Sequence, residues 1–302
     1  MLKSEPVRCV RPQDRELSRV ITEVQAGPYT LRGLSLGGVY TTIQVRELDV
    51  LLDVGLYPRG LCAASRIFLS HGHTDHFSGL AGLLGVQGMM RDKPPPRVFL
   101  PAEIADDVRE TLAVMSRIQG YELAIDAVPM RPGDSQHLGA DLFVRAFRTH
   151  HRVPSRGYQF YRRVQKLRPE FATLDGAEIR DRKQAGEALF EDVERLELAY
   201  ATDTLIRVLD TAPEICRSRV LILECTFLDD RKSLKDSRAG CHIHLDELLE
   251  RAEDLDNEHI VLMHFSQLYS PRRVHEILDR RCPPRLRERI VPFVPARGGW
   301  PG

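Results

Sequence analysis

The stretch Ser70-His71-Gly72-His73-Thr74-Asp75-His76-Phe77 gathers three imidazoles and one carboxylate within six positions. It follows the apolar, strand-like residues 66–69, so its first two histidines, two positions apart in extended backbone, project to the same side. The aspartate and the last histidine lie where an amphipathic helix would begin, and the start of a helix tolerates a carboxylate well. Three nitrogen donors and one oxygen donor on a tight turn suit a divalent ion, zinc first. The alternative is a polar turn that happens to be rich in histidine, and such clustering is a poor way to build a turn.

The overall composition is that of an ordinary globular protein. The chain has 302 residues, of which 42% are hydrophobic and 28% are charged, so it can bury a sizeable core. Lysine and arginine together number 43, as do aspartate and glutamate, and the formal net charge is zero. This balance argues against a strongly basic nucleic-acid-binding protein, although it leaves room for a local basic patch. The length fits two average domains or one large α/β domain.

Cysteine usage and the chain termini indicate the compartment. The scattered cysteines form no C-x-x-C pair, which is typical of free thiols in a reducing compartment. Residues 1–20 are charged and aperiodic without an apolar segment, and no run approaches membrane-spanning length. We therefore expect a cytoplasmic protein whose first 20 residues form a loose leader. The six cysteines are Cys9, Cys62, Cys216, Cys225, Cys241 and Cys282.

Strands and helices are predicted to interleave along the chain. Residues 29–52 alternate between apolar and polar side chains and are rich in β-forming residues, with Gly37-Gly38 as a turn between strands. The polar residues 163–195 are expected to run over the surface rather than enter the core. This order indicates an α/β chain, with one domain over residues 1–302 and four layers. Helices are expected at 80–90, 103–119, 244–254 and 271–280, and further strands at 67–69, 97–100, 123–129, 142–148, 157–162, 196–202, 219–224 and 260–263.

Polar residues follow four of the apolar strands. His151, Asp203, Glu224 and His264 each stand at or just after the carboxyl end of a predicted strand. Sites in α/β sheets are usually built at the carboxyl ends of strands. One such residue is weak support for a site, whereas four of them together with the histidine-rich stretch are much stronger.

Taken together, these motifs resemble those of the metallo-β-lactamase superfamily, in which a His-x-His-x-Asp-His loop seats two metal ions in a four-layer αββα sandwich. The later motifs are similar to the tRNase Z (ribonuclease Z) branch, and residues 166–171 and 223–230 are most similar to its short, plant-like form. The resemblance covers roughly residues 30–275. The motifs that carry it are His151-Arg152-Val153-Pro154-Ser155-Arg156-Gly157-Tyr158, Thr202-Asp203-Thr204, Glu224-Cys225-Thr226-Phe227 and His264-Phe265-Ser266.

The resemblance implies seven metal ligands and two zinc ions per subunit. Two metal ions clamp the attacking and leaving oxygens of a phosphoryl displacement, and they lower the pKa of a bound water towards about 7. The same ligand types can hold manganese or iron. One ion would be held by His71, His73 and His151, and the other by Asp75, His76 and His264, with Asp203 bridging both.

The resemblance also implies catalytic roles and a substrate. Asp75 would orient or deprotonate the nucleophile, and His242, paired with Glu224, would protonate the departing 3′ oxygen. The implied activity is that of an endoribonuclease that cleaves the 3′ trailer of precursor tRNA by metal-activated hydroxide. The implied products are a tRNA with a 3′ hydroxyl and a trailer with a 5′ phosphate. Substrate phosphates would be met by Arg152, Ser155 and Arg156.

Two positions have alternative readings, and one segment departs from the pattern of the family. His150 adjoins His151 and is a second candidate for the ligand, although His151 lies at the family's distance from Tyr158. Asp53 ends a predicted strand and is either a partner of a metal-bound imidazole or a turn cap. Residues 161–199 lack the Gly- and Pro-rich exosite arm with which many members grip tRNA, so a surface excursion is expected in its place.

Two other functions compete with trailer removal. The first is a metallo-hydrolase of the same fold that acts on a smaller phosphodiester or an ester, with the polar excursion serving as a lid. The second is a binding or scaffold protein on a degenerate site, against which the complete ligand set argues. Related enzymes are commonly dimers, so the expected partners are precursor tRNA or another phosphodiester and a second copy of the chain, without a membrane.

Overall fold

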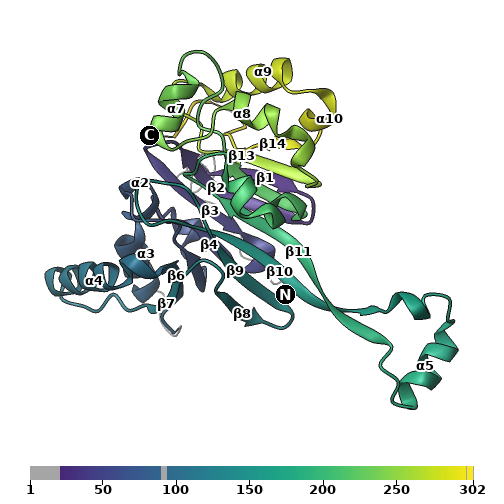
Figure 1. Cartoon of the computed structure of the whole chain (residues 1–302). Coiled ribbons are helices and arrows are strands. Elements are labelled where there is room, and N and C mark those ends of the chain that lie inside the picture. The colour runs from purple at the N-terminus through teal and green to yellow at the C-terminus, as the bar shows by residue number, and fades with distance from the viewer. Residues whose placement is uncertain (1–20, 90–93, 297, 302) are drawn as a thin grey trace, which may run out of the picture.

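The computed structural model describes residues 21–89, 94–296 and 298–301, and it contains two seven-stranded sheets packed face to face (Figure 1). Helices cover the outer faces of the sheets, which gives four layers in the order αββα. The α/β sandwich expected from the sequence is confirmed. No helix within these ranges is both long and apolar enough to cross a membrane.

The first sheet holds the N-terminal strands in sequence order. Strands β1 to β4 pair antiparallel, whereas β4 to β7 pair parallel. The carboxyl ends of β4, β5 and β6 therefore open on one edge. The strands are β1 (Thr22–Ala26), β2 (Tyr29–Leu36), β3 (Tyr40–Val45), β4 (Val50–Leu52), β5 (Arg66–Phe68), β6 (Arg97–Pro101) and β7 (Asp126–Met130).

The second sheet repeats this pattern with the C-terminal strands. Strands β8 to β11 pair antiparallel and β11 to β14 pair parallel, so β11, β12 and β13 also end on one edge. The strands are β8 (Ser135–Gly139), β9 (Leu142–Arg148), β10 (Arg156–Leu167), β11 (Phe190–Ala201), β12 (Val220–Glu224), β13 (His259–Met263) and β14 (Ile290–Pro292).

The alternation of side chains along each strand decides which layer a residue enters. In β4 the first and third residues pack between the two sheets, whereas Leu51 packs outward under the helices. In β12 the first and third residues again face the other sheet, and Leu221 and Leu223 pack outward. Because both faces of these strands are buried, their sequences are continuous apolar runs.

Helices cover each sheet on its outer side. The predicted helix at 103–119 begins at Ala105, because Ala102–Ile104 forms a 3-10 turn, and a second such turn, Ala252–Asp254, ends the segment predicted at 244–254. The first sheet carries α2 (Thr74–Phe77), α3 (Leu80–Met89) and α4 (Ala105–Gln119). The second carries α6 (Val208–Thr211), α7 (Leu234–Gly240), α8 (Leu245–Glu250), α9 (Pro271–Arg281) and α10 (Pro284–Arg287).

Residues 163–195 project from the body as an arm instead of running over its surface (Figure 1). Strand β10 continues to Leu167 and β11 begins at Phe190, so both pass their predicted ends at residues 162 and 196. Helix α5 (Gly176–Gln184) and the 3-10 turn Pro169–Phe171 form its far end. A projecting two-stranded ribbon buries neither face, so its sequence lacks the apolar alternation from which strands are predicted.

A buried carboxylate fixes the root of the arm. The pairing of β10 with β11 shifts there, and Glu197 is the extra residue of the resulting β-bulge, a feature that bends and twists a strand. Glu197 is only 3% exposed, and it accepts hydrogen bonds from the Tyr29 hydroxyl at 2.7 Å and from Arg195 Nε at 2.6 Å. Because Tyr29 belongs to the first sheet, this carboxylate ties the root of the arm to both sheets.

Three strands were not anticipated from the sequence. Strands β1, β8 and β14 lie at sheet edges, where one side is unpaired and the apolar pattern is weak.

The loose leader expected at residues 1–20 lies outside the described residues. The single domain over residues 1–302 stays a prediction.

Candidate active site

The histidine-rich loop lies at the carboxyl edge of the first sheet. It runs from the end of β5 into α2, and within it His71 and His76 are fully buried. Three residues from the second sheet reach the same place: His151 follows β9, Asp203 follows β11 and His264 follows β13. The site is therefore assembled from the facing edges of both sheets.

The carboxylate of Asp203 lies between two groups of imidazoles. Its Oδ2 is 3.7 Å from Nε2 of His71 and 3.8 Å from Nε2 of His151. Its Oδ1 is 3.4 Å from Nε2 of His76 and 3.2 Å from Nε2 of His264. One carboxylate thus presents an oxygen to each group, which is the arrangement of a bridging ligand.

The other two expected ligands complete the groups. Nδ1 of His73 lies 3.1 Å from Nε2 of His151, and Oδ2 of Asp75 lies 3.4 Å from Nε2 of His76 and 3.7 Å from Nε2 of His264. The structure therefore brings together all seven side chains that the resemblance implied. They form two groups of four, His71, His73, His151 and Asp203 in the first and Asp75, His76, Asp203 and His264 in the second.

The donor atoms fit divalent metal ions. Zinc bonds of 2.0–2.1 Å in a tetrahedral site place neighbouring ligand atoms about 3.3–3.4 Å apart, close to the separations found here. Nε2 of His71 is buried and has no hydrogen-bond partner within the described ranges. A buried polar atom without a partner requires an explanation, and a metal bond supplies one. Imidazole and carboxylate donors together suit zinc, iron or manganese.

Backbone strain accompanies this assembly. Asp53, Asp203 and His264 have φ angles of 55°, 46° and 60°. Few residues other than glycine adopt this left-handed conformation, and such strain tends to cluster at functional sites. These are three of the six non-glycine residues with positive φ in the described ranges, and all three stand just beyond parallel strands, at the edges that form the site.

Asp53 holds the metal-ligand cluster from behind. Its Oδ2 lies 2.8 Å from Nδ1 of His76 and accepts a hydrogen bond from the Tyr200 hydroxyl at 2.6 Å. Its Oδ1 accepts a hydrogen bond from the backbone N–H of Ser70 at 2.6 Å. Asp53 is fully buried, and the geometry favours the partner of a metal-binding imidazole over the turn cap. Such a partner fixes the tautomer and orientation of the ring.

We expect Asp53→Asn to weaken zinc binding by about 10–100-fold, the usual cost of losing such a partner. The amide is a poorer acceptor for the proton on Nδ1 of His76 and leaves the ring less firmly oriented. Competition with a chromogenic chelator measures the affinity. Asp49→Asn is the matched control, because Asp49 is exposed just before the same strand and contacts Ser65 instead. Equal affinities in a folded Asp53→Asn protein would leave Asp53 as a turn cap.

His150 and His151 serve different contacts. Nε2 of His151 faces His73, whereas Nε2 of His150 lies 2.8 Å from the Thr211 hydroxyl. The backbone N–H of His150 donates to the Thr204 hydroxyl at 2.9 Å. Of the two alternatives, His151 is therefore the one that lies with the metal ligands.

His242 and Glu224 form a pair beside the metal ligands. Nδ1 of His242 lies 3.1 Å from Oε1 of Glu224, and its ring stacks 5.4 Å from the ring of His264. The buried Glu224 also accepts hydrogen bonds from the backbone N–H of Thr204 and the Thr226 hydroxyl, both at 2.6 Å. A carboxylate held in this way accepts a hydrogen bond from the N–H at Nδ1 and leaves Nε2 for a substrate atom.

The electrostatics of the site favour ionised carboxylates and a cationic His242. Burial would lower the pKa of His242, but the charge and hydrogen bond of Glu224 raise that pKa to about 9. Burial would raise the pKa of Asp75, yet hydrogen bonds from His264 and His76 hold that pKa well below its ordinary value. The pKa of Asp203 is likewise lowered, because nearby histidines outweigh its burial. Ionised carboxylates are the form that binds metal.

Two of the three expected phosphate contacts are engaged inside the protein. Arg156 is buried, and its guanidinium donates to both carboxylate oxygens of Glu103 at 2.6 Å. Ser155 is buried as well, and its hydroxyl accepts a hydrogen bond from Thr149 at 2.7 Å. Both side chains are therefore held by partners within the protein, and their contact with the substrate stays a prediction. Arg152 is exposed and remains a candidate.

Two residues of the site escaped the sequence analysis. The Thr226 hydroxyl lies 2.6 Å from Oε2 of Glu224 and 3.1 Å from Nδ1 of His264, so it links the acid pair to a metal ligand. Its position two residues after Glu224 in a resembling motif was an available signal. Tyr200, which holds Asp53, gave no signal because it stands within an apolar strand.

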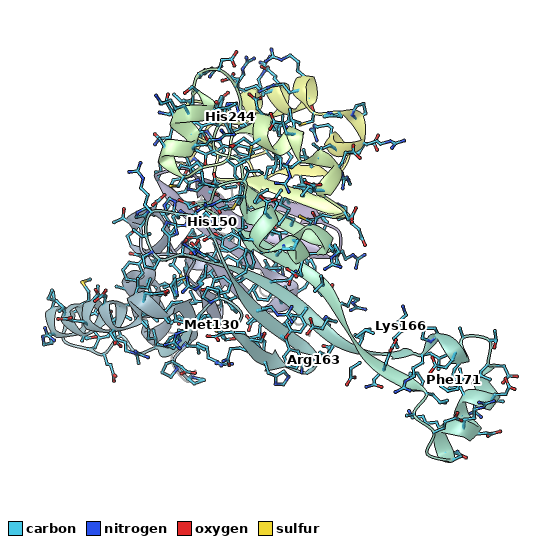
Figure 2. The ribbon with its side chains drawn as sticks, viewed as in Figure 1. Met130, His150, Arg163, Lys166, Phe171 and His244 are labelled. Carbon is cyan, nitrogen blue, oxygen red and sulfur yellow. The ribbon has the colours of Figure 1, made fainter. Side chains whose placement is uncertain are left out.

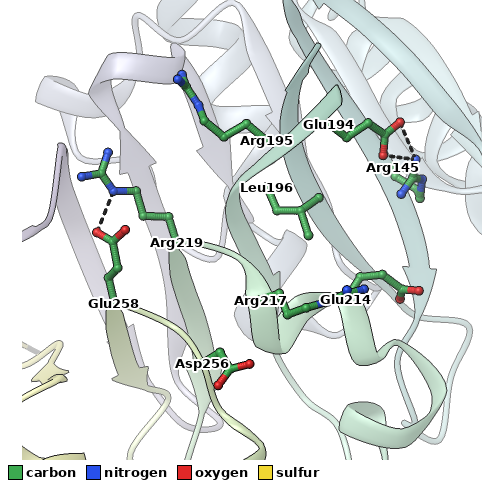
Figure 3. A pocket seen from close by; sticks show the side chains of 9 residues that line it. All are labelled: Arg145, Glu194, Arg195, Leu196, Glu214, Arg217, Arg219, Asp256 and Glu258. Atoms are coloured by element: carbon green, nitrogen blue, oxygen red, sulfur yellow. Dashed lines mark hydrogen bonds and ion pairs between the residues drawn. The ribbon is translucent and has the colours of Figure 1, made fainter. Parts of the chain in front are cut away.

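A cavity of about 690 Å³ lies at the root of the arm, away from the metal ligands. Figure 3 shows the residues that line it. Its charges balance, since Arg145 pairs with Glu194 and Arg219 pairs with Glu258. Arg219 and Glu258 precede β12 and β13, whereas Glu224 and His264 stand at the other ends of these strands. None of the expected site residues lines this cavity, so it is separate from the candidate active site.

Comparisons with known proteins agree with this geometry. A protein-family sequence model described as the beta-lactamase superfamily domain matches residues 58–265, a span that includes every expected metal ligand. The chain is 32% identical to tRNase Z TRZ1 of Arabidopsis thaliana over 86% of this chain and 94% of that protein. It is 30% identical to the chloroplastic tRNase Z TRZ2 of the same plant over 90% of this chain and 77% of that protein.

A solved structure shows the same fold. The short form of human tRNase Z superposes with a TM-score of 0.56 at 20% identity, covering 82% of this chain and 93% of that chain. The plant relatives agree with the resemblance to the short, plant-like form, and the superfamily match agrees with the αββα layers. The chain therefore belongs to the β-lactamase superfamily and, within it, to the tRNase Z family.

Proposed function

We propose that this protein is a metal-dependent endoribonuclease that removes the 3′ trailer from precursor tRNA. The observation that carries the proposal is the Glu224–His242 pair set directly against the metal ligand His264. A ribose oxygen is a poor leaving group, so its departure benefits from an acid in addition to an activated water. The relatives named tRNase Z support the same substrate.

The residues divide the work as follows. The seven ligands would hold two divalent ions, zinc first, which when bound lower the pKa of a coordinated water and offset the charge of the phosphate. Asp75, kept ionised, orients the attacking water and accepts its proton. His242 gives the proton on Nε2 to the departing 3′ oxygen, while Glu224 stabilises the imidazolium. The products are a tRNA ending in a 3′ hydroxyl and a trailer with a 5′ phosphate.

The arm is the proposed contact for the body of the tRNA. Arg163 and Lys166 lie along it and Phe171 lies near its far end (Figure 2). Lys166 and Arg180 are exposed and form no ion pair with any side chain in the described ranges. Free cations on a projecting element suit a phosphate backbone that lies away from the cleavage site.

A homodimer fits the outward face of α4. This helix buries Ala105, Val108 and Leu112, yet it exposes a second apolar pair on its other side, with Ile118 75% exposed and Val114 38% exposed. The first turn of α4 carries Asp106 and Asp107, and its last turn carries Arg117. Two such helices packed antiparallel about a twofold axis would place the acidic end of each near the basic end of the other.

We expect wild-type protein to be a dimer at micromolar concentrations and Ile118→Lys to be a monomer, since a buried unpaired ammonium is costly in an interface. Size-exclusion chromatography with light scattering gives the masses. Ala113→Lys is the matched control, because Ala113 is exposed on a different face of α4. A wild-type monomer, or equal masses for all three proteins, would remove α4 as the interface.

A cytoplasmic location is the remaining part of the proposal. Cys62, Cys216, Cys225, Cys241 and Cys282 are all free thiols, as is usual in a reducing compartment.

The function is tested with labelled precursor tRNA and, in parallel, bis(p-nitrophenyl) phosphate. We expect zinc-loaded protein to release a 5′-phosphorylated trailer and a chelator to abolish that release, with about two zinc ions per chain by elemental analysis. Hydrolysis of the small diester without cleavage of the tRNA would favour the smaller phosphodiester as substrate. Protein without bound metal and without either activity would favour a binding role.

A further inference from the structure

A second cavity opens beside the metal ligands. It measures about 430 Å³, within the range that holds a ligand of nucleotide size, and His151, Arg148, Arg152 and Glu103 are among its lining residues. It lies between the end of β9, the loop that leads to β10 and the 3-10 turn Ala102–Ile104. His151 belongs to both the cavity and the first group of ligands, so the two spaces adjoin.

The cavity has an excess of positive charge. Arg148 is exposed and makes no hydrogen bond or ion pair with its side chain anywhere in the described part of the chain. Arg152 is exposed too, and its guanidinium donates to the backbone carbonyl of Ala239. Glu103 is the one carboxylate in the lining, and the buried Arg156 already neutralises it. Two cations therefore remain without a counter-charge, which favours an anionic ligand.

The lining is held in a fixed position relative to the metal ligands. The Thr149 hydroxyl donates to Ser155 at 2.7 Å and closes the loop on itself. The backbone N–H of Arg156 donates to the carbonyl of Ser70 at 2.9 Å, which joins this loop to the histidine-rich loop. A rigid cavity next to the reacting atoms loses little entropy when a ligand enters it.

We propose that this cavity binds the nucleotides directly downstream of the cleavage position, with Arg148 contacting the first phosphate beyond the scissile one. The inference rests on the proposed function and specifies its substrate path. His242, the proposed acid for the departing 3′ oxygen, does not line the cavity, so the upstream strand runs past His242. The downstream strand keeps the scissile phosphate on its 5′ oxygen and continues on the side of His151.

Trailer length tests the placement of Arg148. A trailer of one nucleotide has no phosphate beyond the scissile one, whereas a trailer of three nucleotides has two. We expect Arg148→Gln to raise KM about tenfold for the substrate with the longer trailer. For the substrate with the shorter trailer, KM should stay within about twofold of the wild-type value, and kcat should be unchanged for both substrates. Arg148→Lys should recover part of the loss, because it keeps the charge. Arg280→Gln, an exposed arginine on α9, is the matched control.

Binding without cleavage provides a second readout. Fluorescence anisotropy with 5′-phosphorylated triuridylate in a chelator should show about tenfold weaker binding to Arg148→Gln. The slope of the logarithm of the binding constant against the logarithm of the salt concentration should be shallower by about 0.7 for Arg148→Gln, the value for one phosphate contact on a single strand. Unchanged binding, or equal losses for both trailer lengths, would overturn the inference. If wild-type protein cleaves no precursor tRNA, the proposed function fails, while the binding result still decides whether the cavity takes a phosphorylated strand.

Discussion

Replacing His242 with alanine is expected to slow the cleavage of precursor tRNA by about 10²–10⁴-fold, the usual contribution of a positioned acid. The ribose 3′ oxygen leaves as a strongly basic alkoxide unless it receives a proton. Glu224 occupies Nδ1 of the imidazole, so Nε2 is the atom that would deliver that proton. Without His242 the substrate would still meet the complete set of metal ligands, and the remaining rate would reflect those ligands alone.

A substrate whose leaving group needs no proton distinguishes a catalytic acid from a metal ligand at His242. A p-nitrophenolate leaves without protonation, so His242→Ala should lower the hydrolysis of bis(p-nitrophenyl) phosphate by less than about tenfold. Zinc content should stay at the wild-type value. His275→Ala, an exposed histidine on α9, should change neither activity.

A different outcome would assign His242 to the metal. Donor atoms of Glu224, His242 and His264 lie within 4.8 Å of one another, so the three side chains also resemble a ligand set. If His242→Ala loses zinc and slows both substrates equally, His242 is a ligand. If it retains zinc and slows neither substrate, the proposed acid is wrong.

The metal centre was largely predictable because coordination chemistry restricts which residue types can serve. His71, His73, Asp75 and His76 form a local motif, and His151, Asp203 and His264 each follow an apolar strand. The structure adds what spacing cannot give: Asp203 faces both groups, and Asp53 supports His76 across 23 positions of sequence. Contacts between distant strands depend on how the two sheets face each other.

Burial and projection were the properties that the sequence concealed. Arg156 has the charge of a phosphate contact, yet it is folded against Glu103 beneath the loop. The arm was expected as a surface excursion because charged residues on both sides of a ribbon mimic a loop. Its strands are recognisable only through their cross-strand register, for example Val164 opposite Val193.

Shortening the arm of residues 163–195 is expected to reduce kcat/KM for precursor tRNA by about a hundredfold. The value of kcat/KM for bis(p-nitrophenyl) phosphate should stay within about twofold of the wild-type value. Several exposed charge contacts, each of up to about 1 kcal/mol, would together account for such a loss. The register provides clean junctions, since Arg163 pairs with Glu194 and Leu167 pairs with Phe190. An Asn-Gly turn in place of residues 164–193 removes the whole arm, and the same turn in place of residues 168–189 removes its far end.

The buried carboxylate at the root of the arm makes the comparison of the two deletions informative. Glu197, with its hydrogen bonds from Tyr29 and Arg195, lies on the body side of both junctions, so neither deletion opens the sandwich. Equal losses in both variants would place the tRNA contact at α5, whereas a loss in the longer deletion alone would place it along the ribbon near Lys166. If both variants cleave precursor tRNA at the wild-type rate, the arm has no part in substrate binding, and recognition must come from the body beside the metal ligands.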